Sequence, residues 1–333
     1  MARGLGIILV TLGHSEPIKD TFPQIWHFIY SFHMPLFFFI SGFLGASAWT
    51  SGSIWGEYKR LFNRRFYIVV PYVMISLTYT VIKIGLPNLA KRQIIWESVV
   101  ANIFLYPGMN PALFLWFLYV IILIWFVAPI LSRLNQYVLF SLLLLCQVVP
   151  IDIDCFGTGL VLHNIIYFYL GLKSSQMSER FQLLLKARSF TIVSFLVFFL
   201  CYVIFKNSNV FVMRTFIAVL GTLWILSICF SLKDYLPVRW LEHCGRHSLQ
   251  IYLLQYFFIF VVYFGLLKLH VHNGFIVLAD FAVGLAGPMF VVKYVFPRSQ
   301  VLGLLYGGTR VHGGPGGGLE KAWFRRRFQW IYG

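Results

Sequence analysis

Charged residues are scarce along this chain, and their scarcity restricts the fold more than any other feature. They make up 11% of the 333 residues, whereas an ordinary soluble domain carries about 25%. So few charges cannot cover a surface that faces water. Hydrophobic residues make up 59% of the chain, and the mean hydropathy is +0.78. We therefore expect most of the surface to face lipid.

Apolar stretches recur along the whole chain. A helix needs about 20 apolar residues to cross the hydrocarbon core of a bilayer. The sequence predicts an all-α, polytopic bundle of about ten transmembrane helices, near residues 3–14, 28–48, 66–86, 112–131, 136–151, 160–173, 189–206, 210–232, 248–268 and 275–297.

The basic residues flank these stretches. In a soluble protein the net charge of +16 would suggest a nucleic-acid partner. Here topology explains it, so we expect the lipid bilayer as the partner and no nucleic acid. With the N-terminus inside, 20 of the 27 Lys and Arg residues fall in cytoplasmic segments. This predicts a multi-pass protein of the cell (inner) membrane with both termini cytoplasmic.

The chain divides into a membrane bundle, residues 1–300, and a flexible basic cytoplasmic tail, residues 301–333. The tail contains the glycine-rich segment Gly313–Gly318 and then basic residues interleaved with aromatic ones. It would either lie on an anionic membrane surface or form a disordered accessory segment. The five cysteines show neither a CxxC pair nor a Cys/His metal spacing, so we expect no disulfide and no metal.

Two ionisable residues stand 11 positions apart in the first apolar stretch, Arg3 and His14. A helix of that length rises about 16 Å, which would put Arg3 at the cytoplasmic mouth and His14 near the outer end. Ionisable groups in a membrane usually face the bundle interior or a water-filled cavity. For Arg3 the sequence alone favours a topological anchor, whereas His14 is equally consistent with an interfacial histidine bonded to the backbone. Glu16 and Asp20 follow closely enough to orient the imidazole.

Two further segments carry candidate groups. His33 enters an apolar stretch in which Pro35 can kink the helix and Ser41-Gly42 allow close helix approach. This suits the wall of a cavity, or ordinary packing around one satisfied histidine. A basic loop follows, with four cations in Lys59–Arg65. Arginine forks bind phosphate oxygens, so a phosphorylated cytosolic molecule would fit there, although a topology signal alone would also explain the loop.

Together these motifs resemble one family. In chain order they are Arg3-x10-His14, Phe32-His-Met-Pro-Leu-Phe-Phe-Phe-Ile-Ser-Gly-Phe43, Arg64-Arg65…Pro71, Leu115-Trp-Phe-Leu118 and Cys244-Gly-Arg-His-Ser-Leu-Gln-Ile-Tyr-Leu-Leu254. The sequence resembles the acyltransferase-3 family of bacterial membrane acyltransferases, in the branch of O-acetylases that modify sugars and exopolysaccharides. The resemblance extends roughly from Arg3 to Pro297.

The resemblance implies an enzyme that moves an acetyl or other acyl group from acetyl-CoA, or another acyl-CoA, to a hydroxyl of a sugar, polysaccharide or lipid-linked glycan. Arg3 and His14 match the family's essential Arg and His. Arg64 and Arg65 match its cytoplasmic arginine motif. We therefore expect these three arginines to bind the acyl-CoA donor.

Acyl transfer to a hydroxyl requires a base, and histidine suits this role because its pKa lies near neutrality. We expect His14 to be that base, with His33 holding or orienting the acyl group and Glu16 as a third catalytic residue. The alternatives are a transfer of succinyl or another acyl group, and a transporter or flippase for a glycan or lipid-linked sugar.

Two departures from the family pattern stand out. The late motif is commonly followed by His, whereas this chain has Gln255. Whatever that His contributes is then absent or supplied by Gln. The family also has a few residues before its Arg, so we expect either a misassigned start codon or a clipped first helix.

Overall fold

The computed structural model describes residues 1–45, 53–87, 95–131, 133–149, 153–175, 179–231 and 238–308. Its regular elements are helices, and these ranges contain no β-strand, which confirms the all-α prediction. Seven segments of the described ranges are long and apolar enough to cross a membrane. Three shorter apolar helices, Ala2–Gly13, Val69–Gly85 and Gln136–Val148, lie where the other three spans are expected. The total of ten remains a prediction.

The seven long segments contain α3 (Pro23–Tyr30) with α4 (His33–Gly45), α8 (Trp116–Leu131), α10 (Thr158–Ser174), α12 (Arg188–Phe205), α13 (Phe211–Ser231), α15 (Ser248–Lys268) and α16 (Asn273–Phe290). The remaining α-helices are α1 (Ala2–Gly13), α2 (Ile18–Thr21), α5 (Ile54–Arg65), α6 (Val69–Gly85), α7 (Val99–Phe104), α9 (Gln136–Val148), α11 (Glu179–Lys186), α14 (Val238–Arg246) and α17 (Gln300–Leu305).

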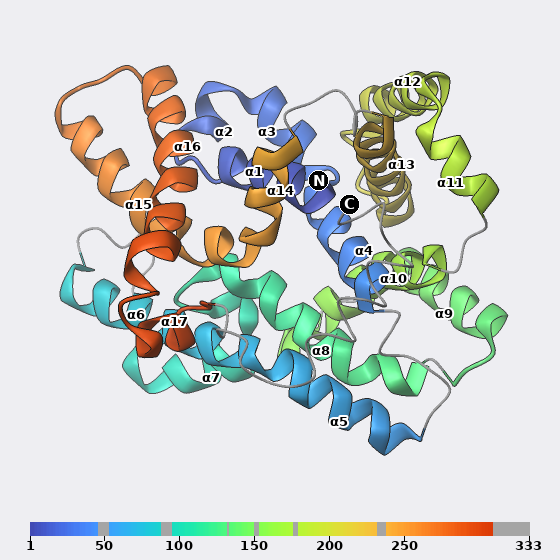
Figure 1. Ribbon diagram of the computed structural model, residues 1–333, viewed down its shortest axis with the longest axis horizontal. Helices are drawn as coiled ribbons and strands as arrows, with labels where there is room; N and C mark the ends of the chain where they lie inside the picture. The colour runs from blue at the N-terminus through green and yellow to red at the C-terminus, as the bar shows by residue number, and fades with distance from the viewer. Residues whose placement is uncertain are drawn as a thin grey trace.

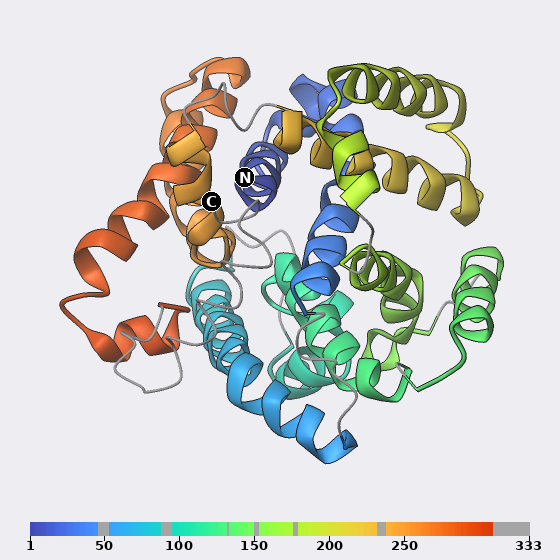
Figure 2. The ribbon, with the colours of Figure 1, turned by 45° about the vertical axis from the view of Figure 1, so that its right-hand side comes forward.

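The first helix lies inside the molecule. In Figures 1 and 2, α1 is near the centre, with α15 and α16 on one side and α12 and α13 on the other. It packs against α14, α15, α4 and α16, and Ile7 and Val10 are almost completely buried. Because protein surrounds α1, its shortness exposes little backbone to lipid.

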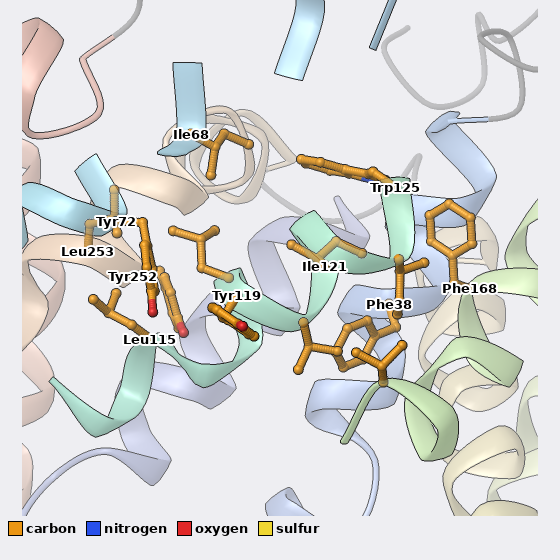
Figure 3. Close-up of a cluster of buried hydrophobic side chains, with 14 of the residues drawn as sticks. Phe38, Ile68, Tyr72, Leu115, Tyr119, Ile121, Trp125, Phe168, Tyr252 and Leu253 are labelled. Carbon is orange, nitrogen blue, oxygen red and sulfur yellow. The ribbon is translucent and has the colours of Figure 1, made fainter. Parts of the chain in front are cut away.

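The hydrophobic core that includes Ile7 and Val10 of α1 continues around α8. Figure 3 shows aromatic side chains of α6, α15, α4 and α10 around this helix. Two tyrosines of this core are satisfied by backbone carbonyls: Tyr72 donates to Ile103 at 2.6 Å, and Tyr119 donates to Phe104 at 2.7 Å. Buried phenols need such partners because the ring is apolar and the hydroxyl is not.

The outer surface is apolar, as the composition predicts. On the peripheral helices α12, α15 and α16, the side chains of Ile192, Val261 and Leu278 are 61%, 75% and 62% exposed. α12 has a mean hydropathy of 2.1. Large apolar side chains on the outside of several long helices fit a bilayer and would be costly in water.

The helix interruption near Pro35 lies before the proline rather than at it. α3 ends at Tyr30 and α4 begins at His33, so Pro35 occupies the first turn of α4. A proline has no N–H to donate to the carbonyl four residues earlier, which here belongs to Ser31. The chain turns at that residue.

The basic segment Lys59–Arg65 is helical, which corrects the prediction of a loop. α5 places one face on α8, where Tyr58 donates to the carbonyl of Phe126 at 3.0 Å. The nearly buried carboxylate of Glu57 pairs with Arg133 at 3.1 Å. The segment is therefore an amphipathic helix. Its apolar face is hard to recognise in the sequence because four cations lie within the same segment.

Glycines bring α4 and α10 into direct contact. A Cβ atom on Gly42 would overlap the carbonyl of Phe168, and a Cβ atom on Gly171 would overlap that of Phe39. Small residues of this kind let helix backbones approach each other in membranes. The predicted role of Ser41-Gly42 in close packing is thus confirmed for Gly42.

We predict that Gly171→Ala destabilises the protein, because the added methyl group would force two backbones apart. Overpacking of this kind typically costs about 1–3 kcal/mol. Gly265→Ala is the matched control, since a Cβ atom there meets nothing within 4 Å. Thermal unfolding in detergent should show a lower midpoint for Gly171→Ala and an unchanged or higher one for Gly265→Ala. Equal midpoints would contradict this account of the α4–α10 contact.

Candidate functional site

The candidate site lies at the C-terminal end of α1, where His14 follows the last helical residue. The backbone N–H of His14 donates to the carbonyl of Val10 at 2.9 Å, so the imidazole is held on the final turn. Tyr256 of α15 lies over this ring, with the two ring centroids 4.8 Å apart. Thr11, one turn earlier, is completely buried, whereas His14 is half-buried. The imidazole is therefore packed on one side without being sealed from its surroundings.

Gln255 of α15 contacts the imidazole directly. Its side chain is completely buried, and its Nε2 lies 2.9 Å from Nδ1 of His14. Its Oε1 accepts a hydrogen bond from the Thr11 hydroxyl at 2.8 Å. A buried amide requires such partners because leaving it unpaired in an apolar bundle is costly. The glutamine that departs from the family motif thus joins α15 to the candidate histidine.

His33 lies close by, at the start of α4, and is almost completely buried. Its Nδ1 lies 2.9 Å from the carbonyl oxygen of Ile29. Tyr30 connects the two histidines, because its ring meets His33 edge-on at 4.6 Å and its hydroxyl donates to the carbonyl of Gly13 at 3.3 Å. The two histidines also interact electrostatically. The fold therefore brings His14 and His33 to one place.

Glu16 lies at the same end of the bundle. It interacts electrostatically with Tyr30, Tyr256 and Asp280. Asp20, the other acid considered for orienting the imidazole, is exposed on α2. The structure therefore groups Glu16 with the two histidines and leaves Asp20 on the surface.

Sequence reasoning missed Asp280 of α16, which is completely buried. Its Oδ2 accepts hydrogen bonds from the Ser15 hydroxyl at 3.0 Å and from the Glu16 N–H at 3.3 Å. Its Oδ1 is buried without a hydrogen-bond partner in the part of the chain that the structure describes. The signal was available, because Asp280 is the one acidic residue in the apolar stretch Asn273–Phe290. An ionisable group in such a stretch is a functional candidate by default.

Arg3 lies at the opposite end of α1, where that helix meets α14. A Cβ atom on Gly4 would overlap the carbonyl of Leu241, so the two helices are in direct contact. The N-terminal amine interacts electrostatically with the acidic Glu242 of α14, with Arg3 and with Arg246 at the end of α14. Arg3 lies in the first turn of α1, where a helix end favours an anion, and Glu242 offsets part of the positive charge there.

Arg64 and Arg65 end α5, and their side chains lie outside the described residues. One turn earlier, Arg60 turns its Nε and Nη2 atoms into the protein. Neither atom has a hydrogen-bond partner among the described residues. A guanidinium in this state can satisfy its N–H groups with an oxyanion, and phosphate oxygens match its fork.

The structure thus divides the expected residues into separate groups. His14, His33 and Glu16 meet at the C-terminal end of α1, whereas Arg3 lies at its other end. α5 runs along the lower edge of the bundle in Figure 1, apart from the central α1. Within the described ranges, no three His, Cys, Asp or Glu side chains cluster so that they could hold a metal ion.

Comparison with known proteins supports the family expected from the motifs. The acyltransferase-3 family model, described as an acyltransferase domain, matches residues 1–296. No curated protein and no solved structure matches the chain. The match covers nearly the whole described bundle, including both histidines and every arginine considered above. The chain therefore belongs to the acyltransferase-3 family and is a membrane acyltransferase.

Proposed function

We propose that this acyltransferase moves an acetyl or other acyl group from cytosolic acyl-CoA to a hydroxyl of a sugar, polysaccharide or lipid-linked glycan. The observation that carries the proposal is the meeting of two histidines and an acid at one end of a helix whose first turn contains Arg3. The donor phosphates bind Arg3, Arg64 and Arg65. Two buried nitrogens of Arg60 that have no partner among the described residues support an anion near α5. The extended pantetheine arm spans the distance to the histidines.

The chemistry then needs one group that accepts the proton and one group that donates a hydrogen bond to the oxygen of the reacting carbonyl. The acceptor oxygen attacks the thioester carbon, a C–O bond forms, and the C–S bond breaks. A histidine takes the hydroxyl proton and returns it to the leaving thiolate, which departs as the free thiol of CoA. His14 and His33 are the proposed catalytic histidines, and Glu16 is a third polar group at the site. Because donor and acceptor approach from opposite sides, the reaction suits an enzyme with cytoplasmic termini in the inner membrane.

Radiolabelled acetyl-CoA tests the proposal against a transporter. The purified protein is incubated with labelled acetyl-CoA and with the glycan fraction of membranes from the source cells. We expect label in the glycan and free CoA in solution, both absent without the protein. A protein that moves an unlabelled glycan across vesicles but never labels it would instead be a transporter or flippase.

His14→Ala and His33→Ala should each reduce acyl transfer by about 10² or more, because each removes a group that touches the reacting atoms. Transfer is measured per amount of inserted protein, so that a loss of expression is not counted as a loss of activity. His163→Ala is the matched control, since His163 also lies in an apolar helix but stacks on Phe211 of α13. More than about a tenth of wild-type activity in His14→Ala would remove His14 from the reaction.

The double variant Arg64→Ala with Arg65→Ala should raise the apparent KM for acyl-CoA and leave kcat nearly unchanged, because lost phosphate contacts weaken binding in ground state and transition state alike. Lys186→Ala with Arg188→Ala is the control for lost positive charge. If the donor KM were unchanged in the first variant, Arg64 and Arg65 would not bind the donor and would serve only as a topology signal.

A further inference from the structure

Hydrogen bonds decide which nitrogen of each histidine carries the proton. A neutral imidazole has one N–H donor and one lone pair, so a partner at one nitrogen determines the state of the other. For His33 the partner is the carbonyl oxygen of Ile29, which can only accept. Nδ1 of His33 therefore carries the proton, and its Nε2 keeps the lone pair that a base needs.

His14 is in the opposite state. The amide nitrogen of Gln255 lies beside Nδ1 of His14 and can only donate, so Nδ1 is the acceptor. The neutral ring then carries its proton on Nε2. In this state Nε2 can donate a hydrogen bond, but it has no lone pair with which to accept a proton.

Two contacts orient the Gln255 amide. Its Oε1 receives the Thr11 hydroxyl at 2.8 Å, and its Nε2 lies 3.5 Å from the carbonyl oxygen of Tyr252. The flipped amide, with Oε1 and Nε2 exchanged, would put Oε1 against that carbonyl oxygen. It would also require Thr11 to give its proton to Ile7, whose carbonyl oxygen lies 2.9 Å away. The buried hydroxyl of Thr11 thus helps to select the state of His14.

We infer that Gln255 is a positioning residue that holds His14 as the Nε2–H tautomer, so that His14 donates a hydrogen bond to the oxygen of the reacting carbonyl and His33 accepts the proton of the attacking hydroxyl. This inference rests on the proposed acyl transfer and divides its two catalytic tasks between the histidines. The oxyanion that forms on attack is stabilised by a donor already aimed at it. His14 is then essential without being the base expected from the sequence.

Other titratable groups surround His14. They are His33 on α4, Tyr30 on α3, Tyr256 on α15, Asp280 on α16, and Glu16 in the turn after α1. A variant altered only at Gln255 keeps all of these groups, as the wild type does. A difference between the pH profiles of those variants and the wild type therefore reports the change made at Gln255.

The decisive variant is Gln255→Glu, with kcat measured against pH as CoA release from acetyl-CoA and the membrane glycan fraction. A carboxylate beside Nδ1 can only accept, so the neutral His14 ring must move its proton to Nδ1 and lose its Nε2 donor. Only a protonated His14–carboxyl pair retains that donor. We expect the variant to gain a descending alkaline limb and to lose about 10² in kcat at the alkaline end. The donor KM should not change.

The opposite assignment predicts a different curve. If His14 were the base, the new carboxylate would orient its Nε2 lone pair, the variant would keep its alkaline activity, and only the ascending limb would move to higher pH. That result would overturn the inference while leaving the proposed acyl transfer intact. Absence of glycan labelling by the wild type would instead overturn the proposed function and this inference with it.

A second pair of variants tests the role of Thr11 without adding charge. Thr11→Val keeps the shape of the side chain and removes the hydroxyl that orients the Gln255 amide, whereas Thr11→Ser retains it. We expect kcat to fall roughly tenfold in Thr11→Val, about the effect of one misplaced hydrogen bond, and to stay near wild type in Thr11→Ser. Equal kcat values in both variants would contradict the orientation by Thr11.

Discussion

A Cβ atom on Gly4 would overlap the carbonyl of Leu241, and one on Gly284 would press into the methyl group of Thr11. These contacts hold α1 against α14 at one end and against α16 nearer the other. In a bilayer, such van der Waals packing takes over much of the role that the hydrophobic effect has in water. The polar contacts of the site depend on it, because the hydrogen bonds to α15 and α16 start from this short helix and the turn that follows it.

Two buried polar side chains of the site find partners in distant parts of the chain. Gln255 bonds residues of α1, and Asp280 bonds the turn after α1, so each links distant parts of the chain. A polar group without a partner is costly at membrane depth. Each of these hydrogen bonds therefore favours one arrangement of the helices that it joins. Some buried atoms, such as Oδ1 of Asp280 and two nitrogens of Arg60, have no partner among the described residues, and they mark places where an incoming group would gain most.

The same packing separates two kinds of chemistry. One end of α1 places Arg3 near Arg246 and Glu242 of α14, and the other gathers two histidines and two acids. In the proposed function the first end meets a charged cytosolic donor and the second performs proton transfer away from it. In that proposal the extended arm of the donor carries the thioester from the first end to the second. This explains why the reaction takes place inside a membrane bundle and not at the surface of a soluble protein.

The sequence by itself determined the class of the protein, because so few charges cannot cover a surface in water, and its motifs were sufficient to predict the family. It also predicted that His14 and His33 belong to one site. It could not predict that Gln255 touches His14, since 241 residues separate them and only the packing of α15 on α1 brings them together. It likewise did not predict a role for Asp280, because this role depends on the hydrogen bonds that its carboxylate makes with the turn after α1. The state of His14 was decided by tertiary structure, because the partner of its Nδ1 comes from α15, whereas the partner of Nδ1 of His33 is the carbonyl of Ile29, only four residues earlier in the chain.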